Sequence, residues 1–198
     1  MIDNVMGSIG SHGTIAGILK TIWLTNRQMP PSITWELYID GSLQRDNTQH
    51  TSTMGLGWFN VISNTSFSCA VNKWPSSTRA ELAAIWTALL TIPSHSSVNI
   101  YTDSSAAITS INNVLFTTKG IKWVKLNNKS LLQHIHSCIK GKNLDFYLHK
   151  VKRHSNNLYN DTADLLAKGG LASDLLLDLD STLVLDSGGL DFFLSWGV

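Results

Sequence analysis

The chain has 198 residues, a formal net charge of +1 and a hydrophobic content of 43%. That apolar share excludes a disordered chain and is enough for one packed domain with additional residues at its ends. No stretch approaches the roughly 20 apolar residues that cross a bilayer, and the N-terminus lacks the pattern of a secretory signal. We therefore expect an intracellular protein that makes no membrane contact, in a nuclear or a cytoplasmic setting that the sequence does not distinguish.

The charges are distributed unevenly along the chain. All 15 Lys and Arg fall within residues 1–170, whereas the last 28 residues hold five aspartates and no base. Nine bases face a single acid, Asp145, between residues 119 and 153: Lys119, Lys122, Lys125, Lys129, Lys140, Lys142, Lys150, Lys152 and Arg153. Such a stretch suits a phosphate backbone, and a solvated lysine-rich surface is the alternative.

The first half of the chain predicts strands. Residues 1–32 are rich in Gly, Ser and Thr and end at Pro30–Pro31, so we interpret them as a leader, either disordered or the remnant of a larger protein. Residues 35–40, 55–62 and 67–71 are β-prone and are separated by polar loops. Three strands with no helix between them predict an antiparallel meander.

The second half alternates helices and strands. A helix from Thr78 to just before Pro93 carries one apolar face: Leu82, Ile85, Trp86 and Leu89. Strands at 98–103 and 144–151 and helices at 104–112, 128–140 and 158–168 follow, the last stopped by Gly169–Gly170. The order predicts an α/β fold with a five-stranded mixed sheet, three strands antiparallel and then two parallel, flanked by helices. The domain would cover residues 33–170, with an acidic and apolar tail at 171–198.

Four carboxylates stand out, although each has an ordinary structural explanation. Asp40-Gly41 is a hairpin signal, and Glu81 lies three residues after Thr78, as in a capping box. Asp103 could cap the following helix, and Asp164 sits early in the last helix, where the helix dipole favours an acid.

The predicted topology nevertheless brings these four acids together. Asp40 and Asp103 would each end a strand at the edge of an open sheet where ligand sites form, and they would lie side by side if those strands are neighbours. The helices carrying Glu81 and Asp164 would reach the same edge. Four acids without a matching cluster of Lys or Arg would repel one another, and hard oxygen ligands in this number suit Mg²⁺, with Mn²⁺ as a substitute. Two such ions ~4 Å apart can clamp the attacking and leaving oxygens of a phosphodiester.

The chain resembles the type 1 ribonuclease H family in four motifs in order. They are Tyr38-Ile39-Asp40-Gly41-Ser42, Thr78-Arg79-Ala80-Glu81-Leu82, Ile100-Tyr101-Thr102-Asp103-Ser104, and the segment from His154 to Asp164. The resemblance spans about residues 33–170. It implies an RNase H-like fold and an endonuclease that hydrolyses the RNA strand of RNA–DNA hybrids, leaving 5′-phosphate and 3′-hydroxyl ends.

The resemblance also implies a role for each matching residue. Asp40, Glu81, Asp103 and Asp164 would hold two Mg²⁺ ions, and His154 would assist proton transfer or product departure, with a surface histidine as the alternative. The substrate would be contacted by Gly41, Ser42, Ser77, Thr78 and Asn160, some of them at the 2′-hydroxyls that distinguish RNA from DNA.

Departures from the family pattern leave alternatives open. Ser105 stands where bacterial relatives often have Gln, and Ser77 and Thr78 stand where they often have two asparagines, which puts the fine substrate contacts in doubt. A shorter piece with Lys119, Lys122, Trp123 and Lys125 replaces the long basic handle of some members. The segment also resembles RNase H regions that follow reverse transcriptases, so we expect a monomeric part of a larger retroelement polyprotein. A non-catalytic hybrid-binding module is the main alternative, and a transposase or integrase of similar fold is a weaker one.

Overall fold

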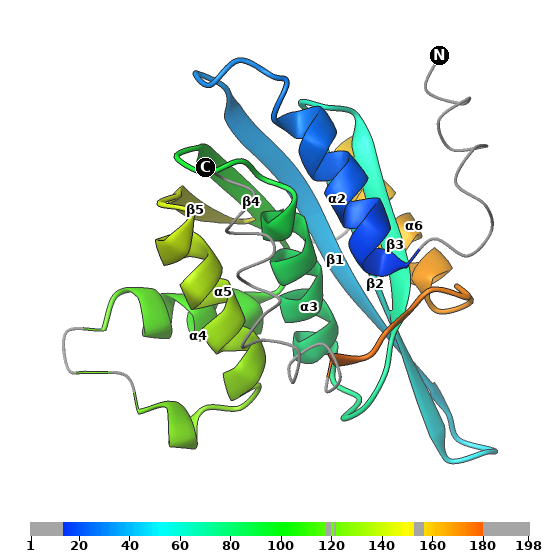
Figure 1. Cartoon of the computed structure of the whole chain (residues 1–198). Helices are drawn as coiled ribbons and strands as arrows, with labels where there is room; N and C mark the ends of the chain where they lie inside the picture. Colours follow the sequence, from blue (N-terminus) through cyan, green and yellow to red (C-terminus); the bar gives the residue numbers. More distant parts are fainter. Residues whose placement is uncertain (1–13, 118–119, 121, 153–156, 180–198) are drawn as a thin grey trace.

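A computed structural model of the chain describes residues 14–117, 120, 122–152 and 157–179. Its centre is a mixed sheet (Figure 1). Strands β1 (Thr34–Asp46), β2 (Thr51–Asn60) and β3 (Thr65–Val71) form an antiparallel meander. Strand β4 (Ser97–Thr102) pairs in parallel with β1, and β5 (Asp145–Lys150) pairs in parallel with β4. The predicted division into three antiparallel strands followed by two parallel strands is confirmed.

The sheet has six strands among the described residues, and the predicted count of five is wrong. The additional strand, β6 (Leu176–Leu177), pairs in parallel with β3, which gives the order β5-β4-β1-β2-β3-β6. Leu177 and Leu179 are buried. A strand of two residues has no readable periodicity, so only its partner strand defines it.

The hairpin of β1 and β2 is longer than the sequence predicts. Residues 43–53 were expected to form a polar loop, but the two strands stay paired as far as Asp46 and Thr51. The extension projects from the body of the molecule as a two-stranded ribbon (Figure 1). Asp40-Gly41 is therefore not a hairpin turn, because the chain continues as strand for six residues beyond Asp40.

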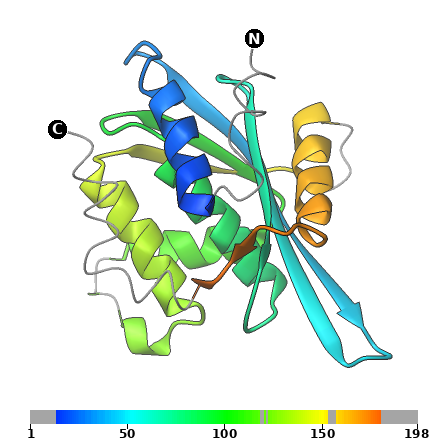
Figure 2. The same cartoon turned by 45° about the vertical axis from the view of Figure 1, so that its right-hand side comes forward.

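Helices cover both faces of the sheet. Helices α3 (Ser77–Leu90), α4 (Ser105–Leu115) and α5 (Lys129–Gly141) lie on one face, and α6 (Leu158–Gly170) packs against the other, on β1, β2 and β3 (Figure 2). A short 3₁₀ turn, η1 (Trp123–Lys125), precedes α5 where the long basic handle was judged to be missing.

Helix α3 is buried on all sides, although the sequence predicts a single apolar stripe. Every residue from Arg79 to Leu90 is buried. The sheet, α5, α4 and α2 all contact this helix, and a helix surrounded in this way needs small or apolar residues at most positions, whereas the buried Arg79 and Glu81 have polar partners. Four alanines in α3 meet that need.

Part of the predicted leader belongs to the folded domain. Residues Ile15–Asn26 form helix α2, which Thr14 caps by accepting a hydrogen bond from the Gly17 N–H. Leu19 and Trp23 of this helix are buried, and Asn26 donates a hydrogen bond of 2.9 Å to the carbonyl of Thr91 at the end of α3. Residues 15–26 are therefore not disordered, and the interpretation of residues 1–32 as the remnant of a larger protein stays a prediction.

Lys142 is not part of a basic surface. It is 2% exposed, and its ammonium donates hydrogen bonds to the carbonyls of Leu89, Leu90 and Ile92 at the C-terminal end of α3. Burial lowers the pKa of this lysine. A cation at the negative end of a helix dipole satisfies carbonyls that would otherwise lack donors inside the protein.

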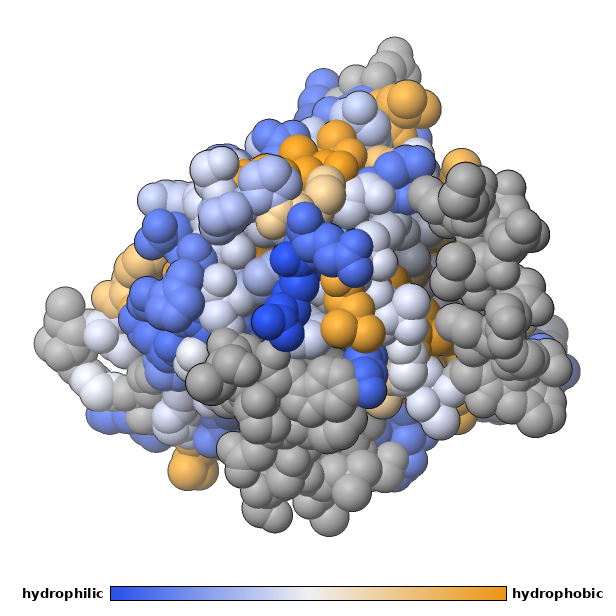
Figure 3. Space-filling model, turned by 45° about the horizontal axis from the view of Figure 1, so that its top comes forward, coloured by the Kyte–Doolittle hydropathy of each residue, from blue (hydrophilic) through white to orange (hydrophobic). Residues whose placement is uncertain are grey.

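The described surface is mixed in character. On the face seen in Figure 3, hydrophilic residues predominate and apolar patches are scattered between them. In the described part of the chain, no helix is both long and apolar enough to span a bilayer.

Candidate active site

Asp40 and Asp103 lie side by side because of the way β1 and β4 pair. The parallel pairing ends at Tyr38 and Tyr101, and each aspartate follows its tyrosine by two residues. Asp40 is in the middle of β1, not at its end as predicted, because β1 continues into the long hairpin. The predicted juxtaposition holds because β4 stops here and leaves the edge open.

Glu81 reaches the two aspartates because Gly41 lets helix α3 approach β1. A Cβ atom on Gly41 would lie 2.7 Å from the carbonyl carbon of Ala80 and would also meet the backbone nitrogen of Glu81. Glycine is therefore required by packing at this position. The predicted contact between Gly41 and RNA stays a prediction.

Glu81 does not belong to a capping box. The N-cap of α3 is Ser76, whose hydroxyl accepts a hydrogen bond from the Arg79 N–H, so Thr78 lies inside the helix. Glu81 is 4% exposed and accepts a 3.1 Å hydrogen bond from the Thr102 hydroxyl. That hydroxyl in turn accepts a hydrogen bond from the Ser104 N–H.

Asp103 is not a helix cap either. The hydroxyl of Ser104 caps α4 by accepting from the Ala107 N–H at 3.2 Å. The ordinary explanations for both Glu81 and Asp103 are thus wrong. Both side chains belong instead to the cluster at the end of the sheet.

Asp40, Glu81 and Asp103 each place a carboxylate oxygen within 4.8 Å of the other two. Burial raises the pKa of Asp40 to about 7, and the charges of Asp103 and Asp164 add to the effect. The pKa of Glu81 is also raised, first by burial and then by the charges of Asp40 and Asp103. Protons therefore compensate part of the negative charge when no cation is bound.

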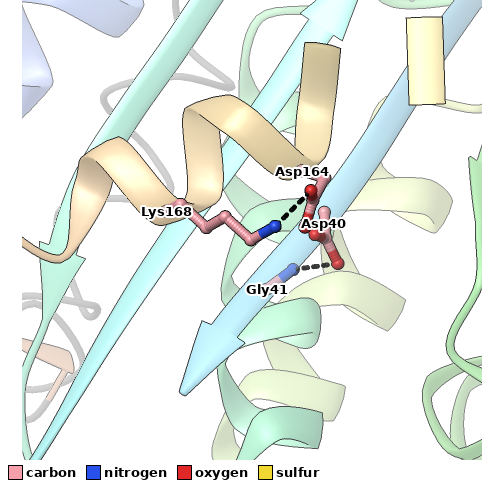
Figure 4. Close-up of polar contacts among 4 residues, drawn as sticks. All are labelled: Asp40, Gly41, Asp164 and Lys168. Carbon is pink, nitrogen blue, oxygen red and sulfur yellow. Dashed lines mark hydrogen bonds and ion pairs between the residues drawn. The ribbon is translucent and has the colours of Figure 1, made fainter. Parts of the chain in front are cut away.

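Asp164 completes the group from the opposite face of the sheet. It lies near the middle of α6, and Asp161 occupies the first turn, so its predicted early place in the helix is wrong. Its carboxyl hydrogen-bonds to that of Asp40, and Figure 4 shows the two side chains pointing toward one another. The second oxygen of Asp40 accepts a 2.9 Å hydrogen bond from the Gly41 N–H.

The helix carrying Asp164 is held against β2 through glycines. A Cβ on Gly57 would lie 2.6 Å from the carbonyl carbon of Leu166, and one on Gly55 would lie 2.7 Å from the nitrogen of Leu171. Likewise, a Cβ on Gly170 would lie 2.6 Å from the carbonyl oxygen of Cys69. Gly169–Gly170 does not stop the helix as predicted. Gly170 is its last residue and serves close packing on the sheet.

One lysine contacts an acid of the cluster directly, and a second contacts the main chain beside it. Lys168 Nζ lies 2.6 Å from Asp164 Oδ2, one helical turn away (Figure 4). The Lys150 ammonium donates to the main-chain carbonyl of Asp103. The four-residue spacing of Asp164 and Lys168 could have revealed the first pair. The second depends on the pairing of β4 with β5.

A cavity of about 510 Å³ opens between the start of α3, the helix that carries Glu81, and the start of α4, the helix that follows Asp103. Its lining includes the predicted substrate residue Thr78 and one residue that the sequence did not single out, Arg79. Arg79 is buried, and its guanidinium donates a 3.4 Å hydrogen bond to the Asn128 side chain. A guanidinium and hydroxyls at the base of a cavity suit a phosphate group.

The structure gives the positions of the other predicted substrate residues, Ser42, Ser77 and Asn160. Ser77 is exposed at the start of α3, Ser42 is half-buried beside Gly41, and Asn160 is buried on α6 one turn before Asp164. Their contacts with a substrate stay predictions. His154 lies outside the described residues, as do Lys119 and Arg153 of the basic stretch.

The donor set fits a hard divalent cation. Three carboxylates converge within ion-binding distance, and Asp164 adjoins them. After burial, the charges of the neighbouring carboxylates contribute to the raised pKa values of Asp40 and Glu81, and a bound cation would relieve that repulsion. Carboxylate oxygens without sulfur or imidazole favour Mg²⁺ or Mn²⁺ over softer metals.

The model of one protein family, RNase H, matches residues 33–172. The chain belongs to the RNase H family. Its fold is similar to a solved structure of the foamy viral protease–reverse transcriptase in complex with double-stranded DNA, with a TM-score of 0.56 and 21% identity. That match covers 72% of this chain and 97% of the other. No protein with curated annotation matches this chain.

Proposed function

We propose that this RNase H family chain is an endonuclease that hydrolyses the RNA strand of RNA–DNA hybrids. The observation that carries the proposal is the convergence of Asp40, Glu81 and Asp103, with Asp164 beside Asp40. All four acids that the family resemblance requires are present. A hybrid-binding module without activity would not need three converging carboxylates that are buried or half-buried, two of which, Asp40 and Glu81, have raised pKa values.

Two Mg²⁺ ions, when bound, would supply a hydroxide nucleophile near neutral pH and stabilise the leaving 3′ oxygen. Asp40, Glu81 and Asp103 would hold one ion, and Asp40 and Asp164 would hold the other. The rigid elements that carry these residues keep their oxygens in place before the substrate arrives, so little reorganisation is needed during the reaction. Thr102 fixes the rotamer of Glu81 through its hydrogen bond.

The cavity between the starts of α3 and α4 would receive a phosphate of the hybrid. Arg79 and Thr78 line it, and Asn128 orients the Arg79 guanidinium. Exposed lysines of the basic stretch, such as Lys122 and Lys125, add favourable charge for a nucleic acid. His154 would assist proton transfer or product departure, as the family resemblance implies. Membership of a larger reverse-transcriptase polyprotein and a monomeric state remain predictions from the sequence.

A cleavage assay with three duplexes tests the proposal. The full chain is incubated with labelled RNA–DNA hybrid, DNA duplex and RNA duplex, with Mg²⁺ or with EDTA. We expect cleavage of the RNA strand of the hybrid alone, with 5′-phosphate ends and only in Mg²⁺. The Asp103→Asn variant should be inactive, whereas Asp145→Asn should retain activity, because Asp145 begins β5 at the opposite end of the sheet.

Two outcomes would contradict the proposal. Full activity of Asp103→Asn would remove the carboxylate cluster from the mechanism. Tight binding of the hybrid without cleavage, in Mg²⁺ and in Mn²⁺, would support the non-catalytic binding module instead.

A further inference from the structure

The geometry points to Lys168 as a resident counter-ion of the carboxylate cluster, which the more weakly bound divalent ion must displace from Asp164. This inference rests on the proposed function and adds a positioning residue to it. Nothing in the sequence motifs assigns a role to Lys168, because it lies four residues beyond the last motif position.

The contact itself is direct. The Lys168 ammonium lies 2.6 Å from Oδ2 of Asp164, while the Asp164 carboxyl also hydrogen-bonds to Asp40 (Figure 4). The Asp164 side chain is 25% exposed and that of Lys168 is 54% exposed. The ammonium therefore approaches the cluster from solvent, the side from which a hydrated divalent ion would also arrive.

The surroundings of the Asp164–Lys168 pair differ from those of an ordinary ion pair on a helix surface. Pairs spaced by four residues on a helix surface usually hold isolated charges and contribute little. Here the acid is one of four carboxylates, and the single positive charge of Lys168 offsets only part of their repulsion. The Lys150 ammonium donates to the main-chain carbonyl of Asp103, whereas Lys168 contacts a carboxylate oxygen.

The backbone of α6 cannot move to release Asp164. Leu166 packs through its main chain on Gly57, and Gly170 packs on the backbone of β3, so the helix on either side of Lys168 is fixed. Only the flexible Lys168 side chain can move away. Binding of an ion at Asp164 is thus an exchange of one cation for another, and its measured affinity includes the loss of the Lys168 contact.

Direct measurement of Mn²⁺ binding tests this exchange. The full chain is titrated with Mn²⁺ by calorimetry and by electron paramagnetic resonance, without substrate. Lys168→Met should bind the weaker ion roughly two- to fivefold more tightly, the size of effect expected for a partly exposed ion pair. Lys168→Arg keeps the charge and should bind Mn²⁺ like the unchanged protein. Lys140→Met removes the same charge from the last turn of α5, and should also leave the affinity unchanged.

A second readout covers variants that fold less well. The increase in melting temperature that Mn²⁺ produces should be larger for Lys168→Met than for the unchanged protein, because the substitution destabilises only the ion-free form. Lys168→Gln, which is polar but uncharged, should behave like Lys168→Met.

The outcomes separate this inference from the proposed function. If Lys168→Met binds Mn²⁺ no more tightly than Lys140→Met, Lys168 is a plain surface partner of Asp164 and the inference is wrong, while hybrid cleavage can still stand. If the unchanged protein binds no Mn²⁺, both the inference and the metal-dependent function fail.

Discussion

Gly41 on β1 provides the space that the backbone nitrogen of Glu81 on α3 occupies. Two ligands of the proposed metal site are thus held at a fixed separation by a contact between main chains. The residue between Asp40 and Ser42 is a glycine for this reason, whatever it contributes to substrate binding.

We expect Gly41→Ala to move α3 away from β1. The added methyl group would meet backbone atoms, which cannot rotate aside, so a loss of about 1–3 kcal/mol in the free energy of unfolding should accompany strongly reduced hybrid cleavage. Urea denaturation and the cleavage assay measure both effects. Gly169→Ala is the matched control, because nothing lies within 4 Å of its Cβ position, and it should stabilise α6 by about 0.5–1 kcal/mol. Equal effects of the two substitutions would contradict the packing argument.

The protonation of Asp40 makes stability depend on pH in the metal-free protein. Its pKa is raised from 3.8 to about 7 in the fold, so the folded state retains a proton that the unfolded state has lost. The free energy of unfolding should therefore fall as pH rises from about 4 to about 7. Asp40→Asn should flatten this dependence and raise the melting temperature in EDTA at pH 7.5, while abolishing cleavage. An unchanged slope in Asp40→Asn would show that other groups cause it.

The same proton competes with divalent ions. Because carboxylates bind cations in their ionised form, Mg²⁺ should stabilise the protein more at pH 7.5 than at pH 5.5. Thermal melts with and without Mg²⁺ at the two pH values measure this difference. A stabilisation by Mg²⁺ that does not change with pH would argue against binding at Asp40.

Thr102 is expected to matter for activity although it has no acidic or basic group. Its hydroxyl donates to Glu81 Oε2 and accepts from the Ser104 N–H, so it links one ligand to the turn that carries Asp103. Thr102→Val keeps the shape and removes both bonds. We expect about a 10- to 100-fold loss in cleavage rate or Mg²⁺ affinity with little change in secondary structure. Thr102→Ser keeps the hydroxyl and should retain most of the activity. If it loses as much activity as Thr102→Val, the methyl group of Thr102 is the part that matters.

Lys142 should be essential for stability and not for chemistry. Lys142→Met leaves the carbonyls of Leu89, Leu90 and Ile92 without their charged donor inside the protein. We expect a loss of about 2–4 kcal/mol in the free energy of unfolding, measured in urea. Lys140→Met, two residues away and exposed, should change stability by less than about 0.5 kcal/mol. If Lys142→Met left the free energy of unfolding unchanged, packing alone would hold the end of α3.

The site could be predicted in outline because its ligands sit at positions that topology defines. Asp103 follows a strand of clear alternation, and Asp40 precedes a glycine on the neighbouring strand. The local explanations for Glu81 and Asp103 competed with this prediction because Ser and Thr cluster at both helix starts. Which hydroxyl becomes the cap depends on where the helix meets the sheet, and the structure selects Ser76 and Ser104.

The parts that could not be predicted depend on partners distant in sequence. Strand β6 exists because β3 offers an open edge, and α2 is stable because its apolar residues meet the core. The full burial of α3 likewise follows from the helices around it. Lys142 looked like one of several surface lysines, since no local pattern reports that three carbonyls would surround it.

The contact between α6 and the sheet limits how far Asp164 can shift to fit cations of different radius. Main-chain atoms of α6 meet Gly55 and Gly57 with no side chain between them, so repacking of side chains cannot widen or narrow that gap. The position of the Asp164 Cα atom is therefore fixed by main-chain packing. Accommodation of cations of different radius must come from rotation about the χ angles of Asp164. A methyl group added at either glycine should shift α6 and so alter ion selectivity.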